Sequence, residues 1–298
     1  MTNVLVLEGS RDTVRINTCR YALLKYLEVY NLNPPPAIAV YVYTDQPALF
    51  ESFIPFIDHF EIKEVSETQF KQWHGSPGFP QRVKMKILEE VLEHINGNVL
   101  YLDTDTCIQN SLEPHFASIE NGAFLLHSCK GNLNEDSEPA ARRLKKFLAD
   151  SSIKQNDNAI STSGMKLWNT CCIGINSKFK TLLDDVLELT DIAGSQFSAP
   201  VWESFAFSYC FQKAGNIQAC KDSIYHYKNL KEFRKLLQLF FRKNEEESIP
   251  NLVKGLRHLD VATIQKQKSL YEALPLYKKW LQALKGKSWS IKQYEKKI

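Results

Sequence analysis

The stretch Asn98-Val-Leu-Tyr-Leu-Asp103-Thr-Asp105-Thr-Cys107 decides the fold. Residues 98–102 form a short apolar run of the kind that is buried in a parallel sheet, and two carboxylates follow it at once. A strand of this kind places both carboxylates at its carboxyl end, where open α/β sheets bind ligands. Two hard oxygen ligands there suit Mg²⁺ or Mn²⁺ held together with a diphosphate, because these ions keep coordination positions open for phosphate oxygens. The alternative is that the two Asp residues only cap the next turn.

The residues before this stretch alternate between strand and helix patterns. Strand patterns cover residues 3–7, 37–43, 60–65 and 98–102. Helical patterns cover residues 14–30, 48–57 and 81–95. The order β-α-β-α-β-α-β predicts a mostly parallel sheet with helices on both faces.

Beyond residue 107 the alternation is looser, as expected where a site is built. Residues 122–127 and 167–176 read as strands, residues 217–227 as an extended segment, and residues 138–150, 178–189 and 201–214 as helices. Residues 151–164 are polar, and a loop of this length inside a compact domain is typical of a lid or of disorder. From Lys228 the pattern is nearly all helical.

Composition limits the class of protein. With 298 residues, 44% hydrophobic and 24% charged, the chain is neither disordered nor fibrous. Residues 1–227 hold 20 Lys and Arg against 27 Asp and Glu, whereas residues 228–298 hold 17 against 7. We therefore expect an acidic domain over 1–227, which would hold the site at residues 103–105, and a basic helical extension over 228–298. Seven cysteines without a Cys-x-x-Cys pair, and no run long enough to span a membrane, predict a reducing cytoplasmic location.

Three segments together resemble a known family. They are Gln81-Arg-Val-Lys-Met-Lys86-Ile-Leu leading into 98–105, Leu167-Trp-Asn169-Thr-Cys-Cys-Ile-Gly174-Ile-Asn, and Ser223-Ile-Tyr-His226-Tyr-Lys228. Over roughly residues 1–230 the chain resembles glycosyltransferases of the GT-A fold, a Rossmann-like mixed sheet, and most of all the family-eight group of glycogenin and the bacterial lipooligosaccharide galactosyltransferases.

The resemblance implies a metal site. In that family the Asp-x-Asp carboxylates and a distal His hold Mn²⁺ on the donor diphosphate, which carries over to Asp103, Asp105 and His226. His258 is the rival third ligand. The metal, Mn²⁺ or Mg²⁺, would neutralise charge on the leaving diphosphate. The resemblance implies that Lys228 lies at the donor. Where the family shows His-Gly and then Lys-Pro-Trp, this chain has His226-Tyr-Lys228-Asn, which departs from the family's diphosphate-contacting loop.

The helix before the Asp-x-Asp motif supplies candidate donor-binding cations. Arg82 and Lys86 are four residues apart and share one helix face. Fork geometry favours Arg82 for phosphate, whereas position along the family motif favours Lys86. Lys84 is expected to point elsewhere. The alternative for each is a solvated basic face.

Other residues are candidates for contact with sugar or acceptor. The resemblance implies that Asn169 hydrogen-bonds a sugar hydroxyl and that Trp168 stacks on a sugar or packs in the core. Glu203, at the start of a helix, is a candidate to position the acceptor hydroxyl or to deprotonate it as a general base. Glu8-Gly-Ser10 lies where this fold receives the nucleotide base, and His127 ends a strand near the same edge.

A second superfamily also begins with Asp-x-Asp. In haloacid-dehalogenase-type phosphatases the first Asp, here Asp103, would be a nucleophile, and Asp184-Asp185 could complete a Mg²⁺ site. Cys107 stands where that motif has Thr, and Asp184-Asp185 fits the solvent face of an amphipathic helix better.

The basic extension has apolar residues at helical spacing, including Leu276, Tyr277, Trp280, Leu281 and Leu284. Such a helix suits an anionic membrane surface, or it docks on the acidic body. We expect a transferase that moves a sugar from a nucleotide-sugar donor, UDP-linked, to a saccharide or lipid-linked acceptor, peripheral to the inner face of the membrane. Nucleic acid is not an expected partner. A phosphatase and a non-catalytic transferase-like scaffold remain the alternatives.

Overall fold

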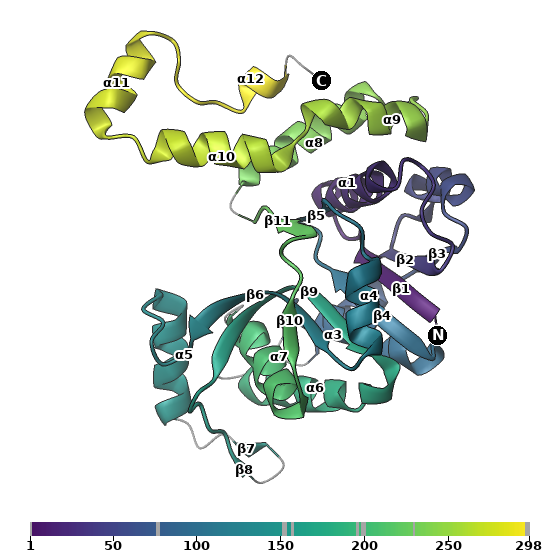
Figure 1. Ribbon diagram of the computed structural model, residues 1–298, viewed down its shortest axis with the longest axis vertical. Coiled ribbons are helices and arrows are strands. Elements are labelled where there is room, and N and C mark those ends of the chain that lie inside the picture. Colours follow the sequence, from purple (N-terminus) through teal and green to yellow (C-terminus); the bar gives the residue numbers. More distant parts are fainter. Residues whose placement is uncertain are drawn as a thin grey trace.

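The computed structural model describes residues 2–75, 78–150, 154–155, 158–194, 197, 201–228 and 230–295. Its centre is a seven-stranded sheet in the order β10-β6-β9-β4-β1-β2-β3 (Figure 1). The strands are β1 (Thr2–Glu8), β2 (Ile38–Thr44), β3 (Phe60–Glu64), β4 (Gly97–Leu102), β6 (Phe124–Asn132), β9 (Lys166–Asn176) and β10 (Ile217–Ala219). Two small ladders pair β5 (Thr106–Ile108) with β11 (Ile224–His226) and β7 (Lys154–Gln155) with β8 (Asn158–Ala159).

The sheet is mixed, with β9 as its antiparallel strand. Strands β4, β1, β2 and β3 are parallel neighbours, and β10 is parallel to β6. Strand β9 runs antiparallel to both β4 and β6. The chain moves from β1 to one side for β2 and β3 and then returns to the other side for β4. The strand order therefore reverses between β1 and β4, which is where open α/β sheets bind ligands.

Helices cover both faces of this sheet. Those of the first 214 residues are α1 (Thr13–Val29), α2 (Glu67–Trp73), α3 (Arg82–His94), α4 (Glu113–Glu120), α5 (Pro139–Asp150), α6 (Leu182–Gly194) and α7 (Val201–Ala214). Strand β1 shows why both faces are covered: Leu5 and Leu7 join one apolar cluster, and Val4 and Val6 join the other. The predicted fold class, a mixed α/β sheet with helices on both faces, is confirmed.

Two predicted segments differ in detail. Residues 47–49 and 51–56 form two 3₁₀ turns, η1 (Pro47–Leu49) and η2 (Glu51–Phe56), instead of one α-helix. Pro55 lies inside η2, where it disfavours a continuous α-helix because it has no N–H and its ring crowds the preceding turn. The predicted loop over 151–164 contains the β7-β8 ladder, and its residues 151–153 and 156–157 lie outside the described ranges.

The segment after β11 is helical, as predicted. Its elements are α8 (Lys231–Lys243), α9 (Ile249–Gly255), η4 (Leu256–His258), α10 (Val261–Glu272), α11 (Leu276–Leu284) and α12 (Lys292–Glu295). Helix α8 is part of the core, because Leu236 and Leu237 belong to the same buried cluster as the apolar residues of α1. Tyr21 of α1 donates a hydrogen bond to the carbonyl of Leu259 at 2.9 Å and packs edge-on against Phe233.

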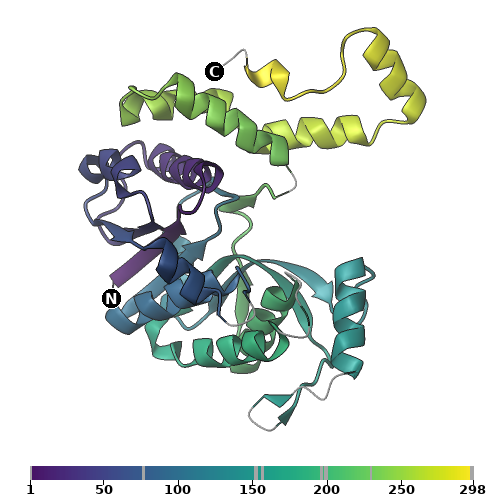
Figure 2. The same cartoon turned by 180° about the vertical axis from the view of Figure 1, so that it is seen from behind.

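Helix α11 behaves differently from α8. Figures 1 and 2 place it at an outer corner, away from the sheet. Its large apolar side chains are 43–84% exposed, namely Leu276, Tyr277, Trp280, Leu281 and Leu284. Among the described helices, none combines the length and hydropathy needed to cross a bilayer.

Candidate functional site

A cleft of about 910 Å³ opens at the carboxyl ends of β1 and β4, at the point where the strand order reverses. Its acidic side chains include Glu8, Asp103, Asp105 and Glu203. Its basic side chains include Arg11, Arg15, Lys84, Lys130, Lys228 and Arg234. The basic side chains of the cleft suit a negatively charged ligand, and its carboxylates suit a cation bound together with that ligand.

Lys84 lies at the centre of a buried ion network. Its Nζ is 2.7 Å from Oδ1 of Asp103 and 2.8 Å from Oε1 of Glu203. It also donates to the carbonyl of Thr170 at 3.2 Å. The Thr170 hydroxyl donates to the same oxygen of Glu203 at 2.7 Å. Lys84 is 6% exposed and Glu203 5%, so each charge depends on the others for its compensation.

The network shifts the pKa values of its members. Burial alone would lower the pKa of Lys84, but the carboxylates of Asp103 and Glu203 outweigh it and raise that pKa well above its usual value. Burial raises the pKa of Asp103 to about 6 against the opposing effect of Lys84, and the charges of Glu203 and Asp105 also raise it. Asp103 therefore holds a proton more readily than an ordinary aspartate.

Asp105 has the opposite environment. Its Oδ1 is 3.2 Å from Nε2 of His226, and its Oδ2 is 3.7 Å from the guanidinium of Arg234. Burial acts to raise the pKa of Asp105, yet the hydrogen bond with His226 and the nearby cations hold it below its usual value. The two carboxylates of the motif therefore have their pKa values moved apart, a feature common at functional sites.

The small β5-β11 ladder brings His226 to Asp105. In its antiparallel register His226 stands opposite Thr106, and the Tyr227 amide donates to the Asp105 carbonyl at 3.0 Å. Asn169 of β9 completes the arrangement, since its Nδ2 lies 2.9 Å from Nδ1 of His226. Three of the predicted site residues therefore come together from segments far apart in the sequence.

The donor set of Asp105 and His226, with Asp103 two residues away in the chain, fits a divalent cation by chemistry. Asp105 and His226 are already in contact, as a shared ion requires. The carboxylate of Asp103 is held by Lys84. Within the described residues, the three-membered ligand group whose donor atoms all lie within 4.8 Å is a different one, made of His127, Cys171 and His226.

The structure does not bring two of the predicted cations to the cleft. The Arg82 guanidinium forms a two-bond ion pair with Asp191, at 2.7 and 3.0 Å, and Lys86 pairs with Glu89. The expectation that Lys84 points elsewhere is wrong. A signal was present, because Lys84 has the buried residues Ile87 and Leu88 three and four positions later and thus lies on the inward face of α3.

The remaining predicted residues divide between the cleft and other places. Lys228, Asn169, Glu203 and Glu8 line the cleft. Trp168 lies beside a core cluster, on β9. His258 lies in η4, outside the cleft lining, and accepts a hydrogen bond from its neighbour Arg257.

The acidic pair proposed to complete the Mg²⁺ site of the phosphatase alternative, Asp184-Asp185, is not at the cleft that contains Asp103. Asp184 is exposed in the first turn of α6, and neither it nor Asp185 belongs to the cleft lining.

Four basic residues of the cleft lining are not predicted by the sequence analysis. Arg11 comes from a loop, Arg15 from the start of α1, Lys130 from β6 and Arg234 from α8 in the extension. No local motif connects these four positions.

Known proteins resemble this chain in structure and not in sequence. Neither a family model nor a curated protein matches the sequence. The galactosyltransferase LgtC, solved with donor and acceptor sugar analogues, is 13% identical, with 72% of each chain covered and a TM-score of 0.48. Mouse xyloside xylosyltransferase 1 in its apo form is 10% identical, with 74% of this chain and 85% of that chain covered and a TM-score of 0.45. The glycosyltransferase GlyE of Streptococcus pneumoniae is 10% identical, with 73% of this chain and 45% of that chain covered and a TM-score of 0.42.

Proposed function

We propose that this protein is a GT-A-type glycosyltransferase that moves a sugar from a nucleotide-diphosphate donor, most simply a UDP-sugar, to a hydroxyl of a saccharide or lipid-linked acceptor. One observation carries the proposal. An Asp-x-Asp pair ends a central strand at the point where the sheet reverses its order, and His226 is brought against Asp105 from over 100 residues later. This arrangement can hold a divalent cation and a diphosphate in one cleft.

Asp103, Asp105 and His226 would hold the cation, Mn²⁺ or Mg²⁺. When bound, it supplies Lewis-acid neutralisation of the negative charge that develops on the leaving diphosphate. Lys84 balances the charges of Asp103 and Glu203 and lines the same cleft, where it would also be a cation for the donor diphosphate. Lys130, Lys228 and Arg234 line the same cleft and are the cations that we assign to the phosphates.

The other cleft residues then fall into donor and acceptor roles. Glu8 at the end of β1 pairs with Arg11 and accepts from the Ser10 hydroxyl at 2.7 Å, which gives the nucleoside a polar, ordered wall. Asn169 would bind a sugar hydroxyl. For Glu203, Oε1 is held by Lys84 and Thr170, so we assign its Oε2 to the acceptor hydroxyl, with orientation as its main contribution.

The test is calorimetric titration of UDP and UDP-sugars with and without Mn²⁺. We expect binding that depends on Mn²⁺, with the Mn²⁺ affinity falling about 10–100-fold or more in Asp105→Ala and in His226→Ala. Asp184→Ala removes an exposed acid outside the cleft and is the matched control. Donor binding that is the same with and without Mn²⁺, or an Asp105→Ala variant with unchanged affinity, contradicts the proposal.

We also propose that α11 rests on an anionic membrane surface and brings the protein to a lipid-linked acceptor. Its exposed apolar side chains recur at i, i+4 and i+8, as in Leu276, Trp280 and Leu284. Lys278, Lys279 and Lys285 lie among or just after them, and each basic charge near an anionic surface contributes about 1 kcal/mol.

Co-sedimentation with vesicles tests the membrane proposal. The full chain should bind vesicles that contain phosphatidylglycerol more strongly than pure phosphatidylcholine vesicles. Trp280→Asp combined with Leu281→Asp should abolish binding, whereas Ile54→Asp, on an exposed apolar residue of η2, should not change it. Equal loss in both variants, or no binding by the unmodified chain, contradicts a membrane role of α11.

A further inference from the structure

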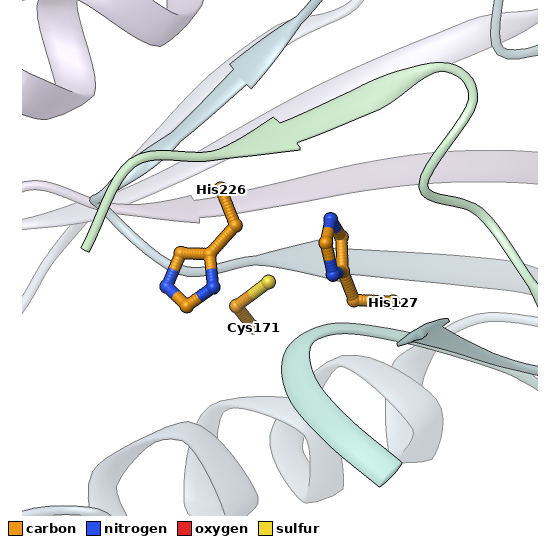
Figure 3. Close-up of side chains that lie close together, drawn as sticks. All are labelled: His127, Cys171 and His226. Atoms are coloured by element: carbon orange, nitrogen blue, oxygen red, sulfur yellow. The ribbon is translucent and has the colours of Figure 1, made fainter. Parts of the chain in front are cut away.

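Two imidazoles and a thiol meet beside the Asp-x-Asp motif. His127 comes from β6, Cys171 from β9 and His226 from β11. One ligand-type atom from each lies within 4.8 Å of the other two. Figure 3 shows the Cys171 side chain between the two rings, whose centroids are 5.7 Å apart. Cys171 and His226 also line the cleft, so this cluster can be reached from it.

The ring of His127 is oriented as in a metal-binding histidine. Its Nε2 lies 2.9 Å from the carbonyl of Ile224, an atom that can only accept, so Nε2 carries the proton. The lone pair is then on Nδ1, whose neighbour is the Ser128 hydroxyl at 3.1 Å. A backbone carbonyl that fixes the tautomer of a ligating imidazole is the usual outer partner of such a residue.

His226 has the same division between its two nitrogens. Nε2 faces the Asp105 carboxylate at 3.2 Å, and Nδ1 faces the amide nitrogen of Asn169 at 2.9 Å, which can only donate. In Figure 3 the nitrogen next to the side-chain attachment, Nδ1, points to the Cys171 side of the ring and Nε2 points away. Asp105 therefore stands behind His226 as the carboxylate does in a carboxylate–histidine–zinc arrangement.

We propose that this chain binds one Zn²⁺ ion through Nδ1 of His127, Sγ of Cys171 and Nδ1 of His226, with the fourth position open to the cleft. Two nitrogens and one sulfur are the ligands that Zn²⁺ prefers, whereas Mg²⁺ and Mn²⁺ prefer oxygen. Bonds of about 2.0–2.3 Å place tetrahedral ligands roughly 3.5 Å apart, so small side-chain rotations close the present cluster on an ion. The ion then takes the place of the Asn169 amide as the partner of Nδ1 of His226.

The site competes with the one proposed for Mn²⁺, a consequence that rests on the proposed function. The two sites use opposite nitrogens of His226. While Zn²⁺ holds Nδ1, the proton stays on Nε2 and is donated to the Asp105 carboxylate, so Nε2 has no lone pair for a second cation. Zn²⁺ should therefore inhibit Mn²⁺-dependent donor binding, and Cys171→Ser should relieve this inhibition.

Cobalt substitution of the full-length, reduced protein tests the site without reference to activity. One equivalent of Co²⁺ should give a sulfur-to-cobalt charge-transfer band, and one equivalent of Zn²⁺ should remove it. Cys171→Ser should lose the band, while the matched control Cys129→Ser, which removes an exposed thiol on β6, should keep it. His127→Gln keeps the thiol and should weaken Co²⁺ binding by at least about tenfold.

No band in the unmodified protein, a band lost in Cys129→Ser and kept in Cys171→Ser, or unchanged affinity in His127→Gln would overturn the proposal. If Cys171→Ser does not fold, the Co²⁺ affinity of His127→Gln alone decides whether the zinc site exists. The outcome is separable from that of the donor-binding experiment, because the cobalt band needs neither UDP nor Asp103. A band without any nucleotide affinity would support the zinc site and contradict the transferase.

Discussion

The cleft and helix α11 depart from the ordinary division of polar and apolar residues in opposite directions. The cleft buries charged groups, with Lys84 and Glu203 only 5–6% exposed. Helix α11 exposes apolar groups, with Leu276 84% and Trp280 63% exposed. The buried charges form ion pairs within the molecule, whereas the apolar side chains of α11 are exposed to solvent.

This difference shows what each region needs. Buried charges are stable only as a complete set, so the cleft is sensitive to the loss of any one member. Exposed apolar side chains contribute little to folding, so we expect changes in α11 to have little effect on stability and to act through the surface contact proposed for it. The following experiments test this contrast.

The largest effect on stability is expected from Lys84→Met. It leaves Asp103 and Glu203 buried without their common cation, which should lower the free energy of unfolding by about 3–5 kcal/mol. Lys86→Met, two residues away on α3, removes a partly exposed cation that pairs within one helix turn, and should cost about 1 kcal/mol or less. Urea unfolding followed by circular dichroism measures both. Equal losses of unfolding free energy in the two variants would contradict the claim that Asp103 and Glu203 depend on Lys84 for their charge compensation.

A leucine pair tests the other side of the contrast. Leu237→Ala in α8 removes a fully buried side chain and should cost about 2–5 kcal/mol. Leu281→Ala in α11 removes a side chain that is 43% exposed, and the change should stay within about 0.5 kcal/mol. The same unfolding measurement applies. A large cost for Leu281→Ala would show that α11 packs in solution against part of the chain.

A smaller effect is expected in the dependence of stability on pH. The pKa of Asp103 is about 6 in the folded protein and near 3.8 when unfolded, so the native state binds this proton more tightly. The group therefore contributes stability below about pH 4, and this contribution is lost as the pH rises through about 6. The difference in unfolding free energy between the unmodified protein and Asp103→Asn should fall by on the order of 1–3 kcal/mol over that range. A difference that rises with pH would contradict the assigned environment.

Much of the fold could be predicted because its strands are apolar runs buried on both faces. Strands β1, β2 and β4 and helix α7 are found where the sequence indicates them. The antiparallel direction of β9 could not be predicted, because an apolar strand carries no sign of its direction. Pro55 is a local signal against an α-helix over residues 51–56, although the apolar spacing there is helical.

The candidate site was predictable where a local motif marks it. Asp103 and Asp105 follow a strand directly, and that alone places them at the sheet edge. The approach of His226 depends on the β5-β11 pairing, which joins segments over 100 residues apart and has no local signal. The shared helix face, the fork geometry of Arg82 and the place of Lys86 in the family motif favour those two cations, yet the inward face of α3 belongs to Lys84, as its apolar neighbours indicate.

The packing of α8 on α1 also affects when α1 can be buried during synthesis of the chain. Helix α1 ends at Val29, and the helix that covers its apolar face begins at Lys231. At about 5–20 residues per second, the roughly 200 residues between them take about 10–40 s to synthesise. During this interval the residues that cover α1 do not yet exist, so Tyr21 lacks its contacts with Phe233 and with the Leu259 carbonyl until the extension has been made.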